Sequence, residues 1–277
     1  MDRRNFIVGA AAWMIAHDLL AEGTASVPRR DADPRIRGIR LQTHHPLEAM
    51  ADFYVGAMGM RRVRSGPRAL VVEAGATRLE FVYEEPTSAD TVWPQGPGGA
   101  FYHFAFNIPE NKIAAARDWQ LERTPLFETP DPMRDPAFAK DVRHFRSWNA
   151  HSVFFYDPAG NVVEHIARHD MNNAAPGAFS PKDFLCVSEI ALVTDDVEAL
   201  AQRLMPDLAI EQYRGGGQFF RALGDEHGLV LLFGRGREQG LGSGKLRRAA
   251  PFPCEIELAG TSSKVALPEG PYFIRSG

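Results

Sequence analysis

The chain has 277 residues, of which 44% are hydrophobic and 24% charged, and this is the composition of an ordinary globular protein with room for one or two cores. Its net charge of −4 and pI near 6.1 give no electrostatic reason to expect a nucleic-acid partner. The two cysteines, Cys186 and Cys254, are too few for a disulfide framework, and the sequence does not say whether they pair. No internal apolar run reaches the roughly 18 residues expected of a membrane span.

The N-terminal residues have the pattern of an export signal. Arg3 and Arg4 precede an apolar stretch from Phe6 to Ala16, and small residues follow around residues 23–25. This order resembles a twin-arginine signal with its paired arginines, apolar segment and small-residue cleavage site. The alternative is an amphipathic N-terminal helix. We expect residues 1–25 to be the signal, with cleavage after Ala25 and a periplasmic or otherwise exported mature protein.

A linker rich in proline, arginine and aspartate over residues 26–35 leads into the first structured unit. Alternating apolar residues predict strands, and helical spacing follows a proline that suits the first position of a helix. The pattern predicts a strand, a helix and three further strands, over residues 36–43, 46–54, 61–64, 69–74 and 77–83.

The same order of elements returns in the next part of the chain. A strand over residues 101–108 and a helix over 110–121 are followed, much later, by a hairpin over 152–156 and 162–167. The stretch between them, residues 122–150, is rich in proline, aspartate and aromatics. Long irregular segments inside compact domains are usually functional, so we expect this one to form a lid or pocket wall.

A third copy begins near Phe184, and only the opening of a fourth follows it. The third copy is predicted as a strand, a helix and three strands over residues 185–194, 196–204, 210–213, 217–223 and 229–233. A glycine-rich linker over 234–245 precedes a last strand over 254–258. Repetition of one unit predicts that the copies bury their apolar faces against one another.

A polar turn, Asp157 to Asn161, leads directly into a short apolar strand that contains Glu164. Proline, glycine and asparagine favour the tight reversal. Because side chains alternate along a strand, Glu164 shares a face with Val162 and Ile166. A carboxylate on such a face costs free energy unless a cation or hydrogen-bond donors meet it. Glu164 is therefore a candidate functional residue, with a solvated strand end as the alternative.

Three motifs together resemble the vicinal oxygen chelate superfamily, which includes glyoxalase I, extradiol dioxygenases and resistance proteins that bind antibiotics. They are residues 53–59 (FYVGAMG), 103–107 (HFAFN) and 157–164 (DPAGNVVE). The resemblance implies an α+β fold in which paired βαβββ modules form cupped mixed β-sheets. It is good over residues 36–170, weaker over 184–234 and poor beyond 250. We therefore expect one domain over 36–170 and a second over 184–277 whose fourth module is truncated.

In that superfamily the first and last strands of each module supply the ligands of a divalent metal ion. Carried over position by position, the resemblance assigns His103 and Glu164 in the second module and Glu80 in the first. Spacing from the expected helix start assigns the remaining position of the first module to Ile39, which cannot bind metal. The corresponding position of the third module is Glu189, but its last strand contains no acid, so we expect no metal site in that half.

One imidazole and two carboxylates suit Fe²⁺, Mn²⁺, Zn²⁺ or Ni²⁺. Glu80 is also a candidate general base, and His151 is a candidate catalytic residue. His45, Asn107 and Trp148 are candidate pocket residues, and His45 with its neighbour His44 is a second choice as ligand. The structural alternatives are a core histidine for His103 and a polar strand–helix turn for His44 and His45.

Two function classes follow from the resemblance. The first is a metal-dependent enzyme, of lyase, isomerase or ring-cleaving dioxygenase type, that acts on a small oxygenated or aromatic substrate. The second is a metal-free protein that binds a small molecule, as the resistance-type relatives do; a structural remnant with neither property is a third option. The expected partner is a small molecule, without nucleic acid or a stable membrane span, and a homodimer is left open.

Overall fold

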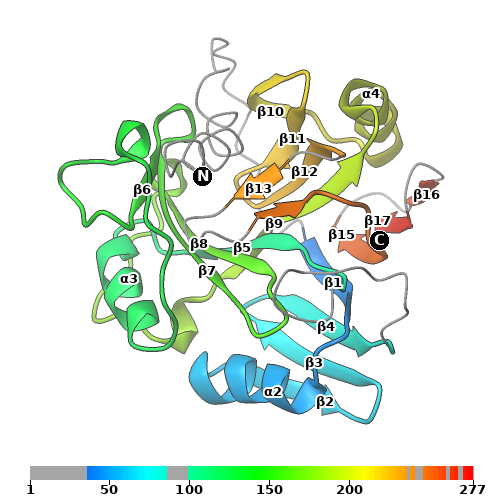
Figure 1. Ribbon diagram of the computed structural model, residues 1–277. Coiled ribbons are helices and arrows are strands. Elements are labelled where there is room, and N and C mark those ends of the chain that lie inside the picture. Colours follow the sequence, from blue (N-terminus) through cyan, green and yellow to red (C-terminus); the bar gives the residue numbers. More distant parts are fainter. Residues whose placement is uncertain are drawn as a thin grey trace, which may run out of the picture.

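The computed structural model describes residues 36–85, 99–235, 238–240, 246–259, 263–267 and 271–276. The expected export signal and linker, residues 1–35, lie outside the described residues. Among the described residues, no helix is both long enough and apolar enough to cross a membrane. The expected α+β order of elements is confirmed, and Figure 1 shows it.

The first module contains four strands and one irregular helix. The helix begins after Pro46, which lacks the N–H that a helix start leaves unpaired, and after five residues it widens into a π-helical turn, Asp52–Ala57. The elements of the first module are β1 (Ile36–Thr43), α2 (Leu47–Ala51), β2 (Arg61–Ser65), β3 (Ala69–Ala74) and β4 (Thr77–Tyr83).

The second module contains the long segment between helix and hairpin. Its elements are β5 (His103–Ile108), α3 (Ile113–Leu121), β6 (Arg143–Phe145), β7 (Ala150–Tyr156) and β8 (Val162–Arg168). The helix begins three residues later than the sequence predicted. The segment over residues 122–150 is not wholly irregular, since it forms β6 and the 3₁₀ turns Asp131–Met133 and Arg146–Trp148.

The third module is complete and the fourth lacks a helix within its described residues. The elements are β9 (Cys186–Thr194), α4 (Val197–Leu208), β10 (Gln212–Gly217), β11 (Phe220–Asp225) and β12 (Gly228–Gly234), then the hairpin β13 (Glu238–Gly240) and β14 (Leu246–Arg248), and finally β15 (Cys254–Leu258), β16 (Ser263–Leu267) and β17 (Tyr272–Ser276). Helix α4 begins at a regular cap, where the Asp196 carboxylate accepts a hydrogen bond from the Ala199 N–H.

The two large sheets each combine modules from different halves of the chain. The eight-stranded sheet has the order β10-β11-β12-β9-β5-β8-β7-β6 and joins the second module to the third. The seven-stranded sheet, β16-β17-β15-β1-β4-β3-β2, joins the first module to the fourth. Figure 1 shows the blue strand β1 beside the orange β15, and β5 beside β9. The first and second modules, which the sequence placed in one domain, therefore do not share a sheet.

Each face of the eight-stranded sheet has its own apolar cluster. The cup face is defined here as the face from which His103, Ala105, Glu164 and Glu189 project, and the back face is the opposite one. The back face belongs to a large core that also contains residues of the seven-stranded sheet and of helices α2, α3 and α4. The cup face is lined by a separate cluster in which Phe127, Phe145 and Trp148 come from the long segment 122–150 and its flanks. That segment thus forms a wall of the cup.

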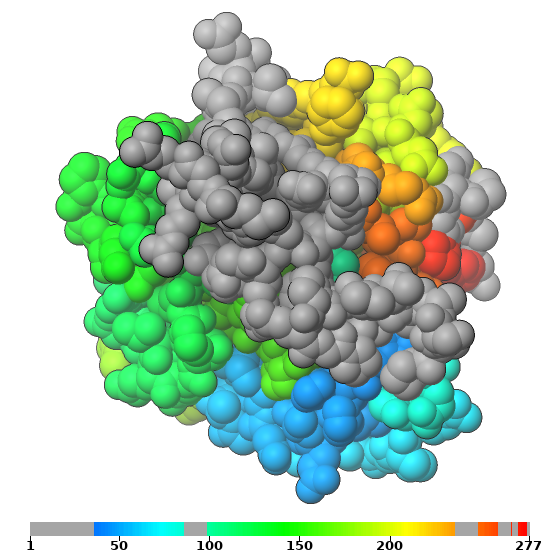
Figure 2. All heavy atoms as spheres, viewed as in Figure 1, coloured from blue at the N-terminus to red at the C-terminus, as the bar shows by residue number. Residues whose placement is uncertain are grey.

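The space-filling view shows the same arrangement. The green second module lies to one side and the yellow third module to the other, with the blue first module beneath them (Figure 2). The site described next lies where the second and third modules meet in the eight-stranded sheet.

Candidate metal centre

Three titratable side chains meet at the junction of β5, β8 and β9. Ala105 of β5 is paired with Glu164 of β8 on one side and with Glu189 of β9 on the other. His103 lies two residues before Ala105 and so projects from the same face. Because Ala105 carries only a methyl group, both carboxylates can approach the imidazole across it.

The three groups are almost fully buried. His103 is 4% exposed, and Glu164 and Glu189 are each 1% exposed. His103 Nε2 lies 3.5 Å from Glu164 Oε2 and 3.8 Å from Glu189 Oε2. Both distances exceed the 2.7–3.2 Å of an ordinary N–H···O hydrogen bond. A ligand atom from each of the three residues lies within 4.8 Å of the others.

The backbone fixes which nitrogen of His103 faces the carboxylates. His103 Nδ1 lies 3.1 Å from the Val162 carbonyl oxygen, which can only accept, so Nδ1 is the protonated nitrogen. In the neutral ring, Nε2 then presents a lone pair toward Glu164 and Glu189. Metal-binding histidines are commonly held in this way, with the second ring nitrogen donating to a carbonyl.

Two arginines bring positive charge to the same region. Arg168, at the end of β8, donates to Glu189 Oε1 through Nη2 and to Asn107 Oδ1 through Nε, at 3.2 Å. Its guanidinium lies 5.4 Å from the ring centre of Trp148. Arg143 is also buried, with its guanidinium 4.5 Å from the Phe145 ring. These contacts leave Glu189 Oε2 directed at His103 while Oε1 is held by Arg168.

Glu164 is less fully satisfied than Glu189. Its Oε1 is buried and makes no hydrogen bond of ordinary geometry within the described part of the chain, although the Ser152 hydroxyl is near enough to lower the pKa of this carboxyl. Burial raises the pKa of Glu164 well above its usual value, and the neighbouring charge of Glu189 adds to this effect. A proton or a cation bound to this carboxylate would therefore stabilise it.

The fourth position of the site is apolar. In the second module, Glu164 pairs with Ala105, which lies two positions after His103. In the third module, Glu189 is the equivalent of His103, and the residue two positions later, Ala191, pairs with Leu231 of β12. Leu231 is therefore the equivalent of Glu164. The third module thus supplies Glu189 to this group, and the second supplies His103 and Glu164. The last strand of the third module contains no acid, as the sequence showed. The expectation of no metal site within that half did not foresee that β9 pairs with β5 and so places Glu189 beside His103.

Glu80 lies in a different sheet from His103 and Glu164. It projects from β4 and forms ion pairs with Arg64 at 2.7 Å and with Arg40 at 3.9 Å. Its expected places as third ligand and as base depended on the first and second modules sharing a sheet, and they do not. Register also corrects the empty position of the first module: Glu80 pairs with Arg40, so the residue matching His103 is Gly38 rather than Ile39.

His151 and His45 also lie away from the cup. His151 pairs with Ala167, whose side chain belongs to the core behind the sheet, so His151 projects from the back face. His45 follows β1 of the other sheet, where its backbone N–H donates to the Thr43 hydroxyl. The face from which His151 projects depends on the pairing register of β7 and β8, which the sequence alone does not give.

Asn107 and Trp148 do reach the cup. Asn107 accepts from Arg168 and donates through Nδ2 to the Glu226 carbonyl at 2.8 Å. The Trp148 indole donates to the Arg214 carbonyl at 3.2 Å, and its ring packs against Tyr213. Both side chains hold the region around Arg168 in place. Arg168, which the sequence analysis did not single out, follows Glu164 by four positions on one strand face, and that spacing was the available signal.

A small pocket reaches the site beside His103. Its volume is about 20 Å³, enough for one water molecule. It is lined by Phe101, Tyr102, His103, Ala191, Val193, Ala249, Ala250, Phe252 and Tyr272. This pocket admits a larger molecule only if part of its lining moves.

No protein-family model and no curated protein matches the chain. Among solved structures, a candidate dioxygenase from Bacillus subtilis aligns over 88% of this chain and 85% of its own, with 15% identity and a TM-score of 0.53. A variant of glyoxalase I from Zea mays aligns over 87% of this chain and 93% of its own, with 13% identity and a TM-score of 0.50. These likenesses show the fold. The mixed, curled sheets and few helices confirm the predicted α+β fold class and are consistent with the fold that the sequence motifs implied.

Proposed function

We propose that the protein is a metal-dependent enzyme of the vicinal oxygen chelate type that acts on a small oxygenated or aromatic substrate. His103, Glu164 and Glu189 are the proposed ligands. The two structures of the same fold named above are a glyoxalase I and a candidate dioxygenase, which supports an enzyme of this broad kind. The proposed reaction is of lyase, isomerase or ring-cleaving dioxygenase type.

The spacing of the three donor atoms supports a shared cation most directly. Two donors that each lie about 2.1 Å from one ion are roughly 3.0–3.4 Å apart. The separations of 3.5 and 3.8 Å from His103 Nε2 to the two carboxylates are close to this range and too long for ordinary hydrogen bonds. The same ion would also meet Glu164 Oε1, which makes no hydrogen bond of ordinary geometry within the described part of the chain.

One imidazole and two carboxylates suit Fe²⁺, Mn²⁺, Zn²⁺ or Ni²⁺. A divalent ion held by three protein ligands acts as a Lewis acid with positions left for the adjacent oxygens of a substrate. Leu231, in place of a fourth ligand, keeps one side of the site apolar. Among the residues of the chain, Arg168 is placed to hold Glu189 in position and to attract an anionic group.

The same charges have a metal-free interpretation. Arg168 and Arg143 supply two positive charges near Glu164 and Glu189, so the four groups balance without an ion. Burial raises the pKa of Glu164, so where no ion is bound this carboxyl takes up a proton more readily than an ordinary glutamate. Metal content distinguishes the two states, because a cation displaces that proton.

Binding of a small molecule without metal is the second candidate, and one observation favours it. The seven-stranded sheet borders a cavity of about 390 Å³, a size typical of ligand sites. The cavity is lined by Arg40, Leu41, Gln42, Val82, Glu84, Pro253, Cys254, Glu255, Leu267, Pro271, Tyr272 and Phe273. A ligand held there would contact β1, β15 and β17 rather than His103.

Calorimetric titration with catechol, which carries two adjacent oxygens, separates these candidates. The protein is first stripped with a chelator and then divided, and one part is reloaded with Fe²⁺ under anaerobic conditions. Binding that requires Fe²⁺ and is lost in Glu164→Gln supports the enzyme proposal. Binding that is equal with and without metal, and that is lost in Gln42→Leu instead, contradicts it and supports the second candidate.

We also propose that the precursor is exported through the twin-arginine route, on the strength of Arg3 and Arg4. Changing both to lysine is expected to retain the precursor in the cytosol, as judged by fractionation and the size of the protein. Normal export of this variant would exclude the route. The result is independent of the metal site.

A further inference from the structure

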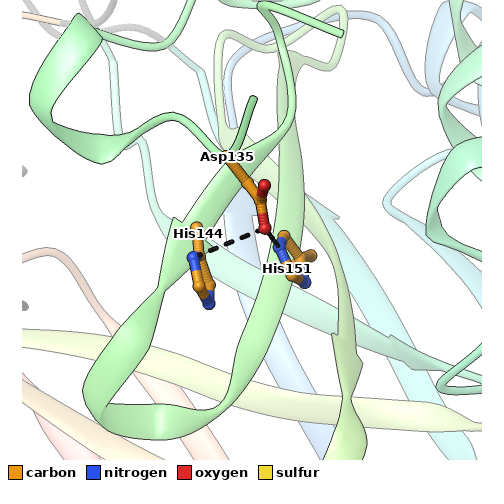
Figure 3. Close-up of side chains that lie close together, drawn as sticks. All are labelled: Asp135, His144 and His151. Carbon is orange, nitrogen blue, oxygen red and sulfur yellow. Dashed lines mark hydrogen bonds and ion pairs between the residues drawn. The ribbon is translucent and has the colours of Figure 1, made fainter. Parts of the chain in front are cut away.

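A second group of potential metal ligands lies on the back face of the same sheet. We call it the hairpin cluster, and it consists of Asp135, His144 and His151. His144 of β6 and His151 of β7 are direct partners across the β6–β7 hairpin, and Asp135 comes from the long segment that precedes β6. Figure 3 shows the Asp135 carboxylate directed toward both imidazole rings.

One carboxylate oxygen of Asp135 faces a nitrogen of each histidine. Asp135 Oδ2 lies 3.1 Å from His151 Nε2 and 3.7 Å from His144 Nδ1. The two imidazole rings are stacked, with centres 4.3 Å apart and planes 11° from parallel. A ligand atom from each residue lies within 4.8 Å of the others. The three donors are thus close enough for a rearrangement of the side chains to bring them onto one ion.

Neighbouring groups hold two of the three donors in this orientation. Asp135 Oδ1 accepts a hydrogen bond from the Ala137 N–H at 2.9 Å, which leaves Oδ2 for the histidines. His151 Nδ1 lies 2.7 Å from His169 Nε2. The Phe138 ring also packs against His151, with centres 4.4 Å apart. Orienting contacts of this kind surround the ligands of protein metal sites.

The hairpin cluster is separate from the cup. Ser152 of β7 pairs with Ile166 of the cup cluster, whereas His151 pairs with Ala167 of the core behind the sheet. The two groups therefore project from opposite faces. The hairpin cluster is also less buried, since the side chains of Asp135 and His144 are 24% and 19% exposed. An ion can exchange with solvent here without passing through the core.

We propose that Asp135, His144 and His151 form a second divalent-metal site, which takes an imidazole-preferring transition ion and does not depend on the proposed function of the cup. Two imidazoles and one carboxylate with open positions are a set used for Fe²⁺ and Zn²⁺, and imidazole donors also suit Cu²⁺ and Ni²⁺. Zn²⁺ is the probe of choice because it has no redox chemistry.

Binding of an ion reverses the proton arrangement of His151. Without metal, Nε2–H donates to Asp135 and Nδ1 accepts from His169. With metal, Nε2 contributes its lone pair to the ion and Nδ1 carries the proton that His169 Nε2 accepts. His169 is thus a positioning residue. The two ring nitrogens of His151 have distinct ¹⁵N resonances, so the position of the proton can be followed in the protein without a substitution at His151.

Equilibrium dialysis against Zn²⁺, followed by elemental analysis, tests the site in the full chain. We expect Asp135→Asn and His144→Asn each to bind one equivalent less than the wild type, or to bind it at least about tenfold more weakly. Glu164→Gln is expected to keep this equivalent, so failure of the cup and failure of the hairpin cluster give different results. His227→Asn, which changes a histidine in another loop, is the matched control and is expected to bind as the wild type does.

A long-range ¹H–¹⁵N spectrum of the histidine rings adds a readout that a purely structural role would not change. Zn²⁺ is expected to shift Nε2 of His151 and to move its proton to Nδ1. His169→Asn is expected to weaken Zn²⁺ binding about 10- to 100-fold while keeping the stoichiometry. Equal Zn²⁺ stoichiometry and affinity in the wild type, Asp135→Asn and His144→Asn would overturn the proposal, as would an unchanged His151 spectrum.

Discussion

His103 Nε2 lies 3.5 Å from Glu164 Oε2 across two neighbouring parallel strands, and Glu189 approaches the same nitrogen from a third strand that belongs to the other half of the chain. The centre is therefore assembled from two modules by strand pairing. It is not contained in either of the two halves that the sequence suggests.

Removing Arg168 is expected to destabilise the protein strongly. Arg168 and Glu189 are both buried and bonded to each other, so Arg168→Met leaves a buried carboxylate without its counter-charge. In the metal-stripped protein, we expect the free energy of unfolding in urea to fall by about 3–5 kcal/mol. Arg275→Met, which breaks an exposed pair with Glu257, is the control and should cost less than about 1 kcal/mol. Equal losses of unfolding free energy in the two variants would show that burial of the Arg168–Glu189 pair does not increase its contribution to stability.

Tyr54 is expected to stabilise the turn that precedes Glu164. Its hydroxyl donates to Asp157 Oδ2 at 2.7 Å in a buried environment. Tyr54→Phe leaves that carboxylate with one donor fewer, and we expect a loss of roughly 1.5–3 kcal/mol in urea unfolding. Tyr83→Phe, at an exposed 3.3 Å contact with Glu85, should change stability by less than about 0.5 kcal/mol. A change below 0.5 kcal/mol in Tyr54→Phe would contradict this role.

Stability is expected to fall in mild acid partly because of His165. Burial lowers the pKa of His165 from 6.5 to about 3, so between these values the unfolded chain binds a proton that the folded chain does not. The contribution of neutral His165 is thus complete above pH 6.5 and is lost as the pH falls toward 3. His151, with its pKa lowered to about 4 chiefly by burial, acts in the same direction.

The check is the free energy of unfolding measured from pH 7 to pH 5 for the wild type and for His165→Asn. The variant lacks the group, so its stability should decrease less steeply with falling pH. Parallel pH profiles of the wild type and His165→Asn would show that His165 does not titrate as inferred.

Local patterns predicted most strands because the residues that favour each strand lie within the strand itself. Alternation gave β1, β4, β5 and β9, and the turn before Glu164 is fixed by its own side chains. Asp157 Oδ1 accepts from the Asn161 N–H at 2.9 Å, and Asn161 Oδ1 accepts from the Tyr102 N–H at 2.9 Å. Those contacts explain why the turn contains Asp157 and Asn161, whereas they do not involve Glu164, the proposed metal ligand.

Sheet partners could not be predicted from local patterns. The βαβββ unit leaves the outer edge of its first strand open, and the sequence does not say which other first strand will pair with it. The structure pairs β5 with β9 and β1 with β15, and this choice brings Glu189 to His103 and leaves Glu80 with Arg64. Spacing had marked Glu189 as the position equivalent to His103. The sequence did not show which strand would pair with the strand that contains Glu189.

The most direct test is the metal content of the protein purified without chelators and then reloaded with Zn²⁺, for the wild type, Glu164→Gln and Glu80→Gln. The wild type and Glu80→Gln should hold the same amount. Glu164→Gln should hold one equivalent less, with unchanged circular dichroism, and the hairpin cluster contributes equally to all three proteins. Equal zinc in Glu164→Gln and the wild type, or loss of zinc in Glu80→Gln instead, would contradict a metal centre at His103, Glu164 and Glu189.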